Sequence, residues 1–118
     1  MKTRKDIECL EKTLGQLTAI HREMSLLSKK SPNDAVNKFK LGRINQALEA
    51  ANNVLGSRYT PVEGFKKFEE DDAPSNSDVV FVLAQYLEEV QRYKADNTVI
   101  HNFKNVYVLN GKPSNVLT

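Results

Sequence analysis

The sequence predicts an all-α fold, a small helical bundle of three long helices plus one or two short ones. Apolar residues recur at spacings of three and four in three long stretches, which is the helical period. Each of these stretches follows residues that are typical of a helix start. A chain of 118 residues can build one core but not two, so we expect a single helical domain over residues 1–118.

The first stretch begins with a capping box. Thr3 and Asp6 are three residues apart, so each side chain can bind the other's backbone N–H. Lys29 and Lys30 suit the negative end of a helix dipole, and Pro32 cannot continue a helix. The helix is therefore expected to end just before the lysines. Its apolar face consists of Ile7, Leu10, Leu14, Leu17, Ile20, Met24 and Leu27.

The second stretch, residues 31–56, has both a start and a stop signal. Ser31 can cap a helix, Pro32 suits its first position, and Asp34 favours the positive end of the dipole. Gly56 follows the last apolar position and can adopt the left-handed backbone of a helix end. The apolar face is made of Leu41, Ile44, Leu48, Ala51 and Leu55.

Residues 57–76 change in character. Thr60 and Pro61 can open a short helix that is anchored by Phe65 and Phe68. Residues 69–76 are acidic and rich in turn formers, so we expect a solvated acidic loop.

The third stretch starts at the serines of residues 75–77. Its broad apolar face runs to Tyr93, and Phe81 points away from that face. We therefore expect Phe81 to contact either a second element or a partner.

The C-terminal part permits two interpretations. Residues 97–110 fit a helix, but Val106 to Leu109 also fit a strand that is followed by a hairpin turn at Asn110-Gly111. Pro113 disfavours a second strand, and no other stretch is an obvious strand partner. We therefore favour the helix and expect a frayed tail over residues 112–118.

The residue types that carry catalysis are sparse. Cys9, His21 and His101 show no metal-ligand spacing, and no glycine-rich phosphate loop or Ser/His/Asp set is recognisable. We expect no enzyme activity, no cofactor and no metal. The single cysteine suggests a reducing, cytoplasmic setting. No apolar run approaches the roughly 20 residues of a membrane span, so we expect no membrane partner.

The remaining signals indicate binding. Net charge is +5 over residues 1–58 and −3 over residues 59–118. The preferred hypothesis is a non-enzymatic adaptor or regulatory protein that presents a helix face to another protein, with or without forming a homodimer. Its expected partner-binding residues are Phe39, Arg43, Phe81, Glu69, Glu70, Asp71 and Asp72.

The alternative hypothesis is a nucleic-acid-binding accessory protein. Cations gather at the end of the first helix and in the first turns of the second, and together they could bind phosphates. The residues of this basic patch are Lys29, Lys30, Lys38, Lys40 and Arg43. Few aromatic residues lie among them, which weakens this hypothesis.

Overall fold

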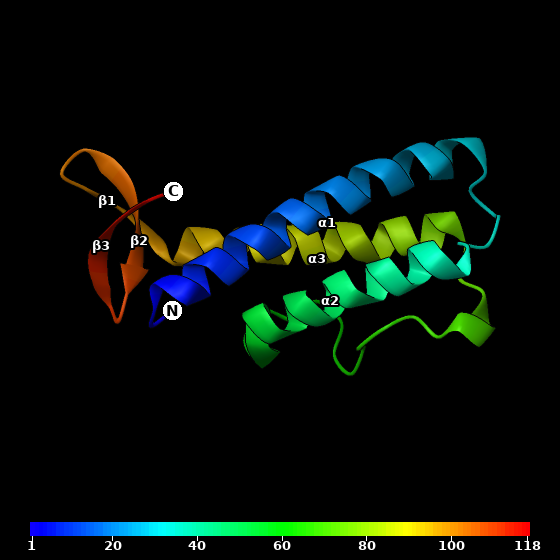
Figure 1. Ribbon diagram of the computed structural model, residues 1–118, viewed down its shortest axis with the longest axis horizontal. Coiled ribbons are helices and arrows are strands. Elements are labelled where there is room, and N and C mark those ends of the chain that lie inside the picture. The colour runs from blue at the N-terminus through cyan, green and yellow to red at the C-terminus, as the bar shows by residue number, and fades with distance from the viewer.

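The computed structural model describes residues 1–118 and shows three helices followed by a three-stranded antiparallel sheet (Figure 1). The elements are α1 (Arg4–Lys30), α2 (Lys38–Tyr59), the 3-10 turn η1 (Glu70–Asp72), α3 (Asn76–Asp96), β1 (Thr98–His101), β2 (Lys104–Leu109) and β3 (Lys112–Leu117). This is an α+β fold, so the all-α prediction is wrong.

The helices form the body of the molecule, and the sheet lies at one end of it (Figure 1). The chain runs along α1 in one direction and returns along α2 and α3 in the other. None of the helices has both the length and the apolar character needed to cross a membrane. The core is made by the expected apolar faces of all three, with Ile7, Leu10, Leu17, Leu41, Ile44, Leu48, Leu83, Tyr86 and Val90 among its buried members.

Two of the expected helix starts are confirmed. In α1 the hydroxyl of Thr3 accepts from the Asp6 N–H at 3.3 Å, and the Asp6 carboxylate accepts from the Thr3 N–H at 3.1 Å. In α3 the hydroxyl of Ser75 accepts from the Asp78 N–H at 3.2 Å. These caps depend only on residues three apart, so the sequence alone defines them.

The start of the second helix was predicted six residues too early, with Ser31 as its cap. Asn37 is the actual cap, and its side-chain oxygen accepts from the Lys40 N–H at 2.9 Å. Ala35 and Val36 are extended because they pair with Pro74 and Ser75, the segment that enters α3. The Val36 N–H donates to the Pro74 carbonyl at 3.0 Å, and the Val36 side chain joins the core.

The end of α2 and the segment after it differ in part from expectation. Gly56 has the expected positive φ of +67°, but its ψ of −178° is not that of the left-handed helix end, and one more turn continues to Tyr59. The expected short helix after Pro61 is absent, and Gly64 has φ +78° there. Phe65 and Phe68 nevertheless anchor the segment against the core, with ring centroids 5.1 Å apart.

The C-terminal helix and the frayed tail are replaced by the sheet. Its strand order is β1-β2-β3, and both turns have two residues with positive φ, namely Asn102-Phe103 and Asn110-Gly111. The hairpin that we considered less favourable is therefore the one formed. Tyr107 explains the preference, because the strand buries its ring completely against the helices.

Pro113 is accommodated because β3 is an edge strand. It lies opposite Val108, next to an irregularity in the pairing of β2 with β3. A proline at an edge costs little when its missing N–H would have faced solvent. Pro113, which disfavours a second strand in the sequence, is therefore compatible with β3 at the edge of the sheet.

Candidate functional site

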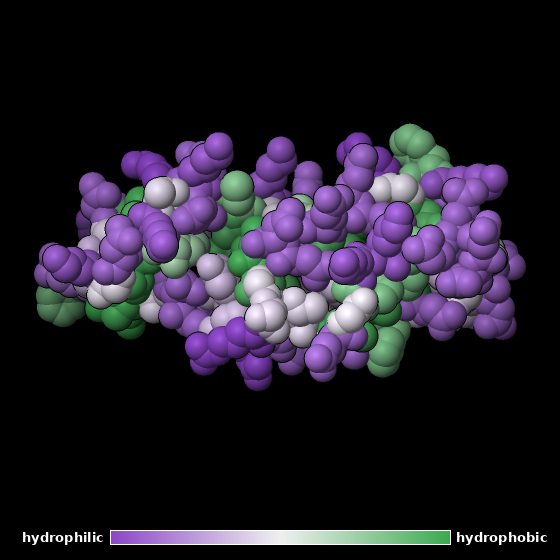
Figure 2. Space-filling model, turned by 90° about the horizontal axis from the view of Figure 1, so that it is seen from below, coloured by the Kyte–Doolittle hydropathy of each residue, from purple (hydrophilic) through white to green (hydrophobic).

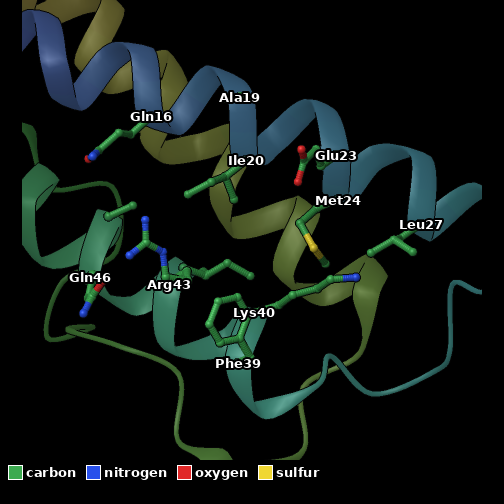
Figure 3. A pocket seen from close by; sticks show the side chains of 12 residues that line it. Gln16, Ala19, Ile20, Glu23, Met24, Leu27, Phe39, Lys40, Arg43 and Gln46 are labelled. Atoms are coloured by element: carbon green, nitrogen blue, oxygen red, sulfur yellow. The ribbon is translucent and has the colours of Figure 1, made fainter.

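A groove of about 400 Å³ lies between α1 and α2, and α3 passes behind it (Figure 3). Each of the two helices contributes six lining residues. These are Gln16, Ala19, Ile20, Glu23, Met24 and Leu27 from α1, and Phe39, Lys40, Arg43, Ile44, Gln46 and Ala47 from α2.

The floor of this groove is apolar and continuous with the core. Met24 and Ile44 are buried core residues, whereas Ile20 and Leu27 are only half-buried. Figure 3 shows Ile20 and Met24 pointing from α1 into the space beside Phe39. The Phe39 side chain is 79% exposed, although it borders an apolar cavity. Covering a phenylalanine fully contributes about 1.5–3 kcal/mol, so an occupant of the groove would gain from it.

The rim of the groove is charged. Lys40 and Arg43 stand on the α2 side, and Glu23 stands on the α1 side (Figure 3). None of these three takes part in an ion pair within the chain. The two ion pairs that form are Lys38–Glu70 at 3.0 Å and Arg92–Glu89 at 3.5 Å. The cations of the rim are therefore available to an external carboxylate.

The structure brings together only part of the expected partner-binding set. Phe39 and Arg43 line the groove, but Phe81 lies on α3, outside it, and is 66% exposed. Residues 69–72 also lie outside the groove, where Glu70–Asp72 form η1. Glu70 approaches the first turn of α2 through its ion pair with Lys38.

The expected basic patch is divided in the same way. Lys29 and Lys30 are exposed at the end of α1, and Lys38 is neutralised by Glu70. Lys40 and Arg43 belong to the rim of the apolar groove. The five cations thus have three different surroundings.

Sequence reasoning missed the α1 side of the groove. It assigned Ile20 and Leu27 to the core, because a helical stripe does not reveal which of its members a neighbour covers. The available signal was Phe39, which falls beside the apolar stripe of α2 and had no partner within the helix.

The titratable groups whose pKa values are shifted lie outside the groove. The side chains with shifted pKa values are Asp6, Tyr59, Tyr86, Tyr93 and Tyr107, and none of these lines it. No three His, Cys, Asp or Glu side chains are grouped so that they could hold a metal ion. Cys9 is exposed. The chain matches no protein-family model, no curated protein and no solved structure.

Proposed function

We propose that this protein is a non-enzymatic adaptor whose α1–α2 groove binds an amphipathic helix of a partner protein. The observation that carries the proposal is Phe39, a large apolar side chain that is 79% exposed on the lip of an apolar cavity. Two helices with an apolar channel between them are the usual receptor for the apolar face of a third. With α3 behind the groove, the docked helix would complete a four-helix arrangement.

The charge of the rim defines the chemistry of the partner. Lys40 and Arg43 lie one turn apart on α2 and have no internal ion pair. A partner helix with Asp or Glu along the edge that faces α2 complements them. Exposed ion pairs of this kind add little affinity, but they orient the helix and speed its association. The affinity comes from the apolar anchors that fill the floor.

The exposed thiol of Cys9 supports a cytoplasmic location. It has no disulfide partner within the chain, and an unpaired exposed thiol is compatible with a reducing compartment.

The test uses two designed helical peptides of about 18 residues, which span five turns. Both carry leucines at i, i+3, i+4 and i+7, and one has glutamates where the other has lysines along one edge. We expect fluorescence anisotropy to show tighter binding of the acidic peptide. Phe39→Ala should weaken that binding about tenfold or more. Phe81→Ala is the matched control, because it removes an exposed phenylalanine outside the groove and should leave the affinity unchanged.

Two results would overturn the proposal. Equal affinity of Phe39→Ala and the wild type would show that the groove is not the docking site. Binding of single-stranded or duplex DNA at low salt, lost when Lys40 and Arg43 are both replaced by Gln, would favour the nucleic-acid hypothesis instead.

A further inference from the structure

The two edges of the sheet differ in how they are protected. Edge strands expose unpaired backbone groups, and proteins block them with prolines, lysines or irregular pairing. The β3 edge has all three features, namely Pro113, Lys112 and a shift in register between Val106 and Val108. The β1 edge, Thr98–His101, has none of them.

The free backbone groups of β1 follow from its pairing with β2. The Asn97 carbonyl accepts from the Val108 N–H at 2.8 Å, which makes these two residues a hydrogen-bonded pair. Hydrogen-bonded and non-hydrogen-bonded pairs alternate along an antiparallel ladder. The N–H and C=O groups of Thr98 and Ile100 therefore point away from β2, toward the open edge.

A row of apolar side chains also ends at this edge. Val99 lies opposite Val106, and Val106 lies opposite Leu117, so the three share one face of the sheet. Val106 is 4% exposed between its neighbours, whereas Val99 is 39% and Leu117 58% exposed. Apolar surface is visible at the end of the molecule that holds the sheet (Figure 2).

We propose that two copies of the chain pair through their β1 strands, antiparallel, about a two-fold axis through Val99. In this register the backbone N–H and C=O of Thr98 bind the C=O and N–H of Ile100 in the second copy, and Ile100 binds Thr98 of the second copy in the same way. All the outward backbone groups of the two strands then have hydrogen-bond partners. The two Val99 side chains meet, and the row of three becomes a row of six. β1 contains no Lys, Arg, Asp or Glu, so the two strands approach without repulsion between such charges.

The size of the contact sets its strength. A four-residue strand with its flanking side chains buries less than the roughly 1,200 Å² of a stable interface. The dimer is consequently weak and dissociates on dilution. This pairing is independent of the α1–α2 groove, which lies on the helical part of the molecule.

The test is sedimentation velocity of the wild type across a hundredfold range of concentration, with the expectation that the mean mass rises toward twice the monomer mass. Ile100→Pro removes an outward N–H, which an edge strand tolerates, and should keep the protein monomeric throughout. Phe103→Gly is the matched control, because Phe103 is exposed in the same hairpin but lies outside the paired strand. It should leave the dimer intact.

Amide hydrogen exchange gives an independent readout. At high concentration the amides of Thr98 and Ile100 should become protected, and circular dichroism should show that Ile100→Pro keeps the wild-type fold. If Ile100→Pro perturbs the fold, Val99→Lys serves instead, because a charge at the meeting point of the two strands should also prevent pairing. A wild type that stays monomeric, or a dimer that survives Ile100→Pro and Val99→Lys, would refute pairing through β1.

Discussion

The side chain of Asn45 binds the main chain of Phe68 at both of its polar groups. Asn45 Nδ2 donates to the Phe68 carbonyl at 2.9 Å, and Asn45 Oδ1 accepts from the Phe68 N–H at 2.9 Å. Two helical turns later, the Asn52 oxygen accepts from the Tyr86 hydroxyl at 2.8 Å. These asparagines tie α2 to the extended segment after Pro61 and to α3, across 23 and 34 residues of sequence.

Replacing Asn45 by Ala should release this extended segment. The Phe68 main chain then loses two partners in a half-buried setting, so we expect a loss of about 1–3 kcal/mol in the free energy of unfolding. Urea denaturation measures it. Asn53→Ala is the control, because Asn53 is exposed on the same helix without a hydrogen bond to its side chain. Equal stability of the two variants would contradict the role given to Asn45.

The capping box makes the start of α1 sensitive to acid. Hydrogen bonds from the backbone N–H groups of Lys2 and then Thr3 hold the pKa of Asp6 below its usual value of 3.8. Because the pKa of Asp6 is lower in the folded state, the stabilisation that its carboxylate provides is present above pH 3.8. It is lost as the pH falls through the pKa of the folded state. The protection of the first-turn amides, measured against the exchange rate of an unstructured chain at the same pH, should therefore fall below about pH 4.

Asp6→Asn should abolish this acid-dependent part of the exchange. Glu8→Gln removes a neighbouring carboxylate that has no such bonds and should preserve it. The same acid dependence in Asp6→Asn as in the wild type would contradict the assignment.

The two hairpin turns should respond in opposite directions to substitution. Phe103 has φ +65° and is fully exposed, so its side chain adds strain without packing. Phe103→Gly should raise the stability by about 0.5–1 kcal/mol. Gly111 has φ +75°, and Gly111→Ala should lower the stability by about 1 kcal/mol. Thermal unfolding measures both, and a loss of stability in Phe103→Gly would contradict this interpretation.

The hydroxyl of Tyr107 has no hydrogen-bond partner although it is buried. Burial, and secondarily the charge of Glu11, raise the pKa of Tyr107 to about 12 from 10.0. Because the pKa of Tyr107 is higher in the folded state, its contribution to stability is fully present below pH 10. That contribution is lost as the pH rises from about 10 to about 12. Tyr107→Phe should remove that alkaline loss and leave the protein as stable as the wild type, or more stable, at pH 7.

Denaturant titrations at pH 7 and in the alkaline range check this expectation. If Tyr107→Phe unfolds with alkali in the same way as the wild type, the transition belongs to another group.

The parts of the fold that depend on near neighbours were predictable. The Thr3–Asp6 box, the Ser75 cap and the apolar faces of the helices follow from spacings of three and four residues. The start of α2 was not predictable in this way, because Val36 is held extended by Pro74, a residue far along the chain.

The sheet was missed for a related reason. Val106 to Leu109 is too short for its period to distinguish a strand from a helix, and its partner strands carry weak signals of their own. The groove was predicted in part. Phe39 and Arg43 lie in it, but the contribution of Ile20 and Leu27 depends on how α1 packs against α2.

We propose that the α1–α2 groove is a docking site for an acidic amphipathic helix. The most direct measurement is a ¹H–¹⁵N NMR titration of the full chain with the glutamate-bearing peptide. The shifted amides should cluster at residues 16–27 of α1 and 39–47 of α2, and the sheet should be unaffected. No shifts, or shifts centred on β1 to β3 or on the exposed face around Phe81, would contradict it.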